Sequence, residues 1–88
     1  MQVFIDNDEG YLAWLASNPD GWVINSHRKP SPSYLRLHRS PRPLTGGVPA
    51  NGRSWTNGYR KTCGTEAELR AWALGEVGGV AVPCSRCA

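Results

Sequence analysis

The sequence predicts a small single domain of the α+β class. Apolar side chains recur at helical spacing over residues 11–16, and residues 34–39 alternate between apolar and polar as a half-buried strand does. A capping box at residues 65–68 marks the start of a second helix. Compact domains are seldom much shorter than 88 residues, so we expect one domain over residues 1–88. The expected order is helix, strand, strand, long basic loop, short strand, helix and a C-terminal CxxC zinc knuckle at residues 80–88.

The first helix is expected to follow residues 1–6, which are typical of either a short strand or a loose terminus. Asn7 or Asp8 can cap this helix through a side-chain oxygen. The turn-forming residues 17–21 then end it. The apolar stripe of this helix consists of Tyr11, Leu12, Trp14, Leu15 and Ala16.

Three strands are expected in the middle of the chain. Residues 22–25 form an apolar run typical of a buried strand, and residues 58–63 have the composition of a third strand. In the alternating segment between them, Leu35 and Leu37 should face the core. The residues expected to share the other face are Tyr34, Arg36 and His38.

The second helix is expected to begin at Thr65, whose side chain can cap the amide of Glu68 while Glu68 caps Thr65 in return. Glycines favour the left-handed conformation that ends many helices, so Gly75 or the pair Gly78 and Gly79 should mark its end. The apolar stripe of this helix consists of Leu69, Trp72 and Ala73.

The charges of the chain are segregated. Between His27 and Lys61 the sequence holds eight Arg or Lys residues and no Asp or Glu, and all seven acidic residues lie outside this segment. Ordinary protein surfaces mix the two signs, because mixing lowers self-repulsion. A block of one sign therefore favours a polyanion as the binding partner.

Aromatic residues are interspersed with these cations. Arginine binds phosphate in bidentate geometry, and aromatic rings stack on exposed bases. We therefore expect binding of nucleic acid, DNA before RNA, through loops at residues 27–33 and 40–57. The alternative is that Tyr34 and Trp55 simply cover a thin core. The expected contact residues are Arg28, Lys29, Tyr34, Arg36, Arg39, Arg42, Arg53, Trp55, Tyr59, Arg60 and Lys61.

The three cysteines predict a structural zinc ion. Cys84 and Cys87 have the spacing with which two thiolates chelate one metal, and Cys63 offers a third thiolate. The fourth ligand should be an imidazole, for which we favour His38 over His27. The alternatives are three reduced cysteines with Cys63 buried as a small apolar residue, or a disulfide if the protein is exported.

Other functions are disfavoured. The sequence has no clustered carboxylates for Mg²⁺ and no phosphate-binding glycine motif, so we do not expect an enzyme. It has no signal sequence and no long apolar run, so a cytoplasmic location without membrane contact is expected. The second hypothesis for function is a zinc-stabilised protein-interaction module that recognises an acidic partner.

Five short segments carry a family resemblance: residues 19–25, residues 34–39, residues 55–56, residues 59–63 and the final CxxC. Together they resemble small zinc-type accessory domains found beside restriction or modification enzymes in high-GC bacteria. The resemblance implies a DNA-targeting role, with modified DNA as a candidate target and a nuclease as partner or fused domain. In that pattern a cysteine lies shortly after the histidine, whereas residues 40–42 are Ser-Pro-Arg here. This departure leaves His38 as the substitute ligand.

Overall fold

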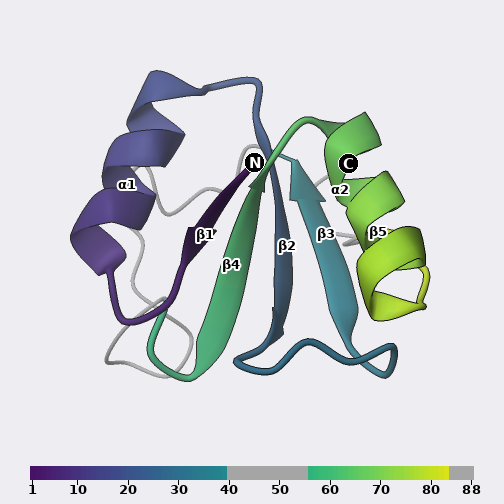
Figure 1. Cartoon of the computed structure of the whole chain (residues 1–88). Coiled ribbons are helices and arrows are strands. Elements are labelled where there is room, and N and C mark those ends of the chain that lie inside the picture. The colour runs from purple at the N-terminus through teal and green to yellow at the C-terminus, as the bar shows by residue number, and fades with distance from the viewer. Residues whose placement is uncertain (40–55, 84–88) are drawn as a thin grey trace.

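The structure, a computed structural model, describes residues 1–39 and 56–83. Within these residues five strands form one mixed sheet in the order β1-β4-β2-β3-β5 (Figure 1). The β1–β4, β4–β2 and β2–β3 pairs are antiparallel, and β3–β5 is parallel. The strands are β1 (Gln2–Phe4), β2 (Trp22–His27), β3 (Leu35–Arg39), β4 (Tyr59–Gly64) and β5 (Val82–Pro83).

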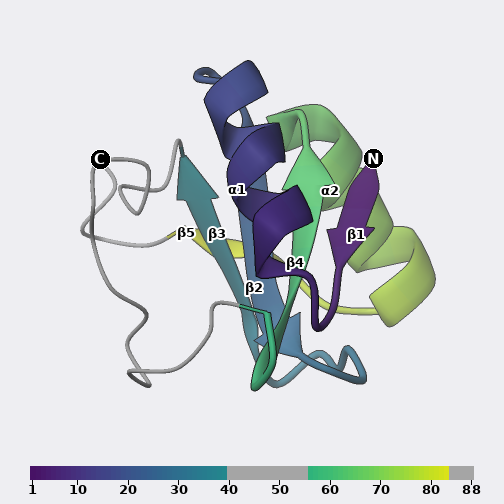
Figure 2. The same ribbon diagram turned by 90° about the vertical axis from the view of Figure 1, so that its left-hand side faces the viewer.

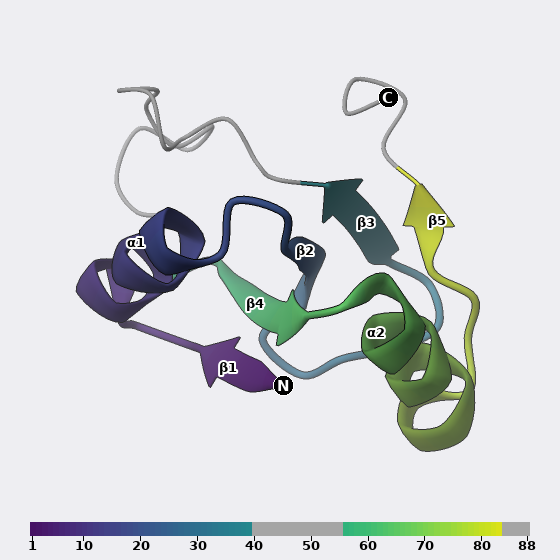
Figure 3. The same ribbon diagram turned by 90° about the horizontal axis from the view of Figure 1, so that it is seen from above.

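Two helices cover opposite faces of this sheet, as Figure 3 shows for the described residues. Helix α1 (Asp8–Ser17) packs on one face, and α2 (Glu66–Trp72), which continues as the π-helix η2 (Ala73–Val77), packs on the other. The side chains of β2 contribute to both packed faces, because successive side chains of a strand point to opposite faces of the sheet. Val23 belongs to the cluster under α1, and Ile24 belongs to the cluster under α2.

Helix α1 is capped and buried largely as its sequence predicts. The Asn7 side chain accepts a hydrogen bond of 2.9 Å from the Gly10 amide. Tyr11 and Leu15 are buried, but Ala16 is exposed, so the prediction that Ala16 belongs to the apolar stripe was wrong. The helical residues Tyr11 and Leu15 pack in one cluster with Phe4, Val23 and Cys63.

Helix α2 begins with the predicted capping box. The Glu68 amide donates to Thr65 Oγ1 at 3.1 Å, and the Thr65 amide donates to Glu68 Oε1 at 2.9 Å. The helical stretch ends at Gly78, which has a φ of 81°, a left-handed conformation that glycine adopts without strain. The buried cluster under α2 consists of Ile24, Leu35, Leu37, Leu69, Ala73 and Ala81.

The α+β class and both helices are therefore confirmed. Residues 2–4 form a strand, and β2 continues to His27, two residues beyond its predicted end. No helix in the described part of the chain is long and apolar enough to span a bilayer. The predicted CxxC knuckle falls on residues 84–88, which lie outside the described residues.

Two leucines of the second helical stretch provide a matched test of this packing. Leu69 in α2 is fully buried against the sheet, whereas Leu74 in η2 is 62% exposed. Leu69→Ala should lower the free energy of unfolding by about 2–5 kcal/mol, because it removes core contacts and leaves a cavity. Leu74→Ala should change it by no more than about 0.5 kcal/mol. Chemical denaturation measures both, and equal losses would contradict this arrangement.

Candidate nucleic-acid interface

The sheet face under α1 carries polar residues beyond the area that the helix covers. In Figure 2 α1 crosses in front of β4 and β2, and β3 lies beside the helix. Cross-strand register pairs Asn25 of β2 with Lys61 of β4 and with Arg36 of β3. Paired residues point to the same face, and β2 residues two apart do too. Lys61, Asn25 and Arg36 therefore form a row on the same face as Val23.

Three aromatic rings gather at one end of this row. His27 and Tyr59 are cross-strand partners, and their ring centroids lie 6.0 Å apart with an interplanar angle of 29°. Tyr34 lies 5.4 Å from His27 and 5.9 Å from Tyr59, again between centroids. His27 and Tyr59 are exposed, and Tyr34 is half-buried. We call His27, Tyr34 and Tyr59 the aromatic cluster.

A chain of hydrogen bonds connects the polar row to the aromatic cluster. Lys61 Nζ donates a short hydrogen bond to Asn25 Oδ1, and Asn25 Nδ2 donates to the Tyr34 hydroxyl at 3.0 Å. The same ammonium lies 5.9 Å from the ring centroid of Tyr59 and 6.0 Å from that of Tyr11, within cation–π range. Asn25 thus uses both ends of its amide to hold Tyr34 and Lys61 in place.

Burial perturbs the titration of two basic groups on this face. It lowers the pKa of Lys61 to about 8, an effect that Cys63 and Asp8 partly oppose, so the ammonium still carries its charge at neutral pH. The pKa of His38 is also lowered, first by burial and then by the charges of Lys61 and Arg36. His38 is therefore neutral at pH 7 and contributes no charge to the face.

Strand alternation places two of the predicted contact residues on the opposite face. Arg39 pairs with Trp22 in register, and its guanidinium lies 6.0 Å from the Trp22 ring centroid. Arg60 lies 5.2 Å from the Trp72 ring centroid, and its Nε donates to Thr62 Oγ1 at 3.1 Å. Trp22 and Trp72 both pack against the cluster under α2. The basic block of the sequence is thus divided between the two faces of the sheet.

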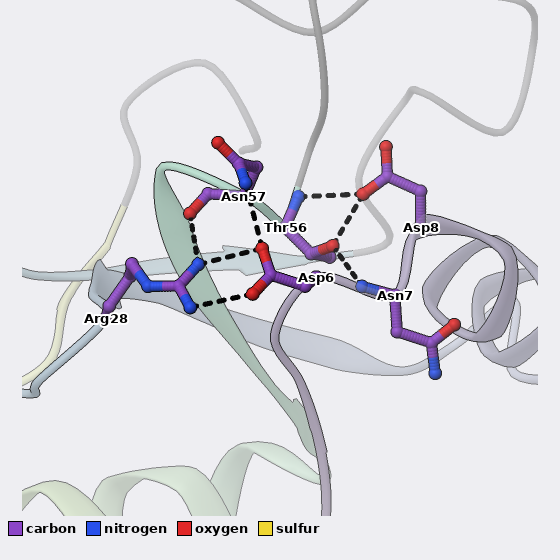
Figure 4. Close-up of polar contacts among 6 residues, drawn as sticks. All are labelled: Asp6, Asn7, Asp8, Arg28, Thr56 and Asn57. Atoms are coloured by element: carbon purple, nitrogen blue, oxygen red, sulfur yellow. Dashed lines mark hydrogen bonds and ion pairs between the residues drawn. The ribbon is translucent and has the colours of Figure 1, made fainter.

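Arg28, another predicted contact residue, is already paired with a carboxylate (Figure 4). Its Nη1 and Nη2 donate to the two carboxylate oxygens of Asp6 at 2.9 and 2.7 Å. Nη1 also donates to the Asn57 carbonyl at 2.6 Å, and Asn57 Nδ2 donates to Asp6 Oδ1 at 2.9 Å. The neighbouring Lys29 is exposed. Of these two loop cations, Arg28 therefore has a structural role.

A second set of hydrogen bonds connects Thr56 to the start of α1. Thr56 donates to Asp8 Oδ1 from its amide at 2.9 Å and from its hydroxyl at 2.6 Å, and the Asn7 amide donates to Thr56 Oγ1 at 2.7 Å. We call these contacts, together with those of Arg28, the Asp6–Arg28 clamp. It fixes the chain just before β4, and with it the start of the strand that carries Tyr59 and Lys61.

An acidic groove lies at the other end of β2 and β4. It has a volume of about 550 Å³, and its lining includes Trp14, Asp20, Trp22, Glu66 and Glu68. Trp22 pairs with Gly64 there, whereas His27 pairs with Tyr59 at the end that carries the aromatic cluster. Glu68 pairs there with the N-terminal ammonium at 3.6 Å, and Glu66 pairs with Arg70 at 3.0 Å, so the charges at this end are largely matched within the domain.

The predicted zinc ligands are only partly described. Cys63 and His38 share one sheet face. Each of them pairs in register with Val23 of β2, so Val23 lies between the two expected ligands. Cys63 is fully buried in the cluster under α1, and this burial raises the pKa of its thiol to about 12. No group of three or more His, Cys, Asp or Glu able to hold a metal occurs within residues 1–39 and 56–83. Cys84 and Cys87 lie outside the described residues, as do Arg42, Arg53 and Trp55.

A comparison with known proteins found no relative of this chain. No protein-family model, no curated protein and no solved structure matches this chain. The resemblance to zinc-type accessory domains therefore stays a prediction. The sequence pattern did not single out Asn25 or His27 as contact residues: the second strand was expected to end at Asn25, and His27 entered only as the first residue of the expected binding loop at residues 27–33. Continued alternation from Trp22 to His27 would have placed both on one face of the strand, whereas their contacts with Tyr34 appear only in the folded chain.

The Asp6–Arg28 clamp gives a prediction for pH dependence. Hydrogen bonds from Arg28 and Asn57 lower the pKa of Asp6 from 3.8 to about 2. The clamp should therefore stabilise the fold above about pH 4, and this contribution should be lost as the pH falls through about 2. In Arg28→Ala the pKa of Asp6 should rise toward 3.8, as followed by NMR titration of its carboxyl carbon. Lys29→Ala is the control, and an unchanged Asp6 pKa in Arg28→Ala would contradict the clamp.

The zinc prediction requires metal analysis. Protein prepared without chelator should contain about one zinc ion per chain. His38→Ala should lower this content, because His38 is the favoured nitrogen ligand. A metal-free protein in which Cys84 and Cys87 react freely with a thiol reagent would contradict the prediction.

Proposed function

We propose that this chain binds nucleic acid through the sheet face beside α1. The single observation that supports the proposal is the juxtaposition of the aromatic cluster with Lys61 and Arg36 on one face. Cations bind the phosphate backbone, and aromatic rings offer surfaces on which bases stack. A face that bears both kinds of group side by side suits a nucleic acid better than either kind would alone.

The residues of this face have distinct roles in the proposal. Arg36 is half-buried on β3, with a planar fork of donors that matches a phosphate. Lys61 supplies a positive charge whose position is fixed by Asn25. Exposed Lys29 follows His27 closely in the chain and extends the positive charge past the end of β2. At the opposite end the N-terminal ammonium and Arg70 are paired with Glu68 and Glu66, which favours contact at the end with the aromatic cluster.

DNA remains the first target to test, in keeping with the resemblance to DNA-targeting accessory domains. In this proposal the chain directs a nuclease, as partner or fused domain, to the DNA that the nuclease cleaves. Modified DNA is a candidate target. An acidic protein partner would use the same cations but would not need the exposed rings of His27 and Tyr59. Competition between DNA and an acidic polypeptide of equal charge separates these two partners.

Arg36→Gln should weaken binding to labelled DNA and reduce the slope of log affinity against log salt by about one. The variant removes one phosphate contact and keeps a side chain of similar length. Arg70→Gln is the matched control, because Arg70 lies on α2 and pairs with Glu66 at 3.0 Å. Fluorescence anisotropy at several salt concentrations measures both slopes. Absence of binding to any DNA at low salt, or equal effects of the two variants, would contradict the proposal.

A further inference from the structure

We infer that the aromatic cluster is a binding site for an unpaired nucleobase, so that the preferred ligand is single-stranded. This inference rests on the proposed function and deepens it. Two rings of the cluster are open to solvent: His27 is exposed, and Tyr59 is 39% exposed. Large aromatic rings that gather on a surface are suited to stack on another flat ring, and every base has such a face.

The third ring is held in place before any ligand arrives. The Tyr34 hydroxyl accepts a hydrogen bond from Asn25, whose other end is held by Lys61. A phenol that accepts one hydrogen bond keeps its own O–H as a donor. Tyr34 can therefore add a ring edge and a hydrogen-bond donor to the site. Because these groups are already ordered, a ligand loses little further conformational entropy on their account.

The position of the cluster disfavours readout of an intact duplex. Paired bases present their edges in the grooves, while their faces are covered by stacking. Proteins that read the major groove commonly insert a helix. Here α1 contains no Lys or Arg and begins with Asp8 and Glu9. Helix α2 carries Arg70, but this residue is paired with Glu66.

Neither described helix thus offers the charge that a groove-reading helix needs. The exposed rings instead lie at the end of β2 and β4, on a sheet face. Sheet faces that carry aromatic rings suit bases that have been unstacked or splayed out. These two observations together favour a single strand over a duplex.

The test uses a set of labelled DNA probes of about 12 nucleotides, a length within the site sizes of single-strand binding domains. The probes are an oligothymidine strand, an abasic strand with the same number of phosphates, and a duplex of equal length. The abasic strand keeps the phosphate charge and lacks the bases. Oligothymidine should bind roughly ten-fold more tightly than the abasic strand, and more tightly than the duplex.

Tyr59→Ala should abolish most of the difference between oligothymidine and the abasic strand, whereas Tyr59→Phe should keep it, because the ring is retained. Tyr59 is 39% exposed and lies outside both buried clusters, so Tyr59→Ala should remain folded, as circular dichroism checks. If Tyr59→Ala nevertheless unfolds, His27→Ala serves the same purpose, since His27 is also exposed.

Results that would contradict the base-binding site differ from results that would contradict the proposed function. Equal binding of oligothymidine and the abasic strand would overturn the base site while leaving the proposed function intact. Tighter binding of the duplex, or an unchanged preference in Tyr59→Ala, would do the same. Failure of all three probes to bind at low salt would overturn both the proposed function and this inference.

Discussion

The alternation of side chains along β2 is the constraint on which the rest of the structure depends. β2 lies between β4 and β3, with Val23 packed under α1 and Ile24 packed under α2. A slip of one residue would exchange the residues on these two faces and would move Asn25 and His27 away from Arg36, Lys61 and Tyr59. The same alternation sends Asn25 and His27 to the face of Val23, so the register that builds the core also assembles the polar row and the aromatic cluster.

Much of the local structure could be predicted because its causes are local. The capping box of Thr65 and Glu68 and the cap at Asn7 involve residues three apart. The alternation that buries Leu35 and Leu37 is likewise contained in one short segment. Ala16 was assigned wrongly because a small residue at the edge of a helical stripe is buried only if a neighbouring element covers it.

The arrangement of the candidate site could not be predicted, because it depends on contacts between distant residues. The clamp brings Asp6 to Arg28 and Asn57, and the pairing of Lys61 with Asn25 spans 36 residues. The run of basic residues in the sequence suggested one basic surface. Strand alternation instead places Arg36 and Lys61 on the α1 side of the sheet and Arg39 and Arg60 on the α2 side. Sheet order is set by such non-local pairing, which no short pattern in the sequence encodes.

The central claim is that one face of the sheet, and one end of it, contacts nucleic acid. NMR titration of isotope-labelled protein with a short single-stranded DNA tests it most directly, because each face carries its own aromatic reporters. The ring resonances of His27, Tyr34 and Tyr59 should shift with added DNA, while the indole resonances of Trp22 and Trp72 on the α2 side should remain nearly unchanged. Shifts confined to Trp22 and Trp72, with the aromatic cluster unaffected, would contradict the account.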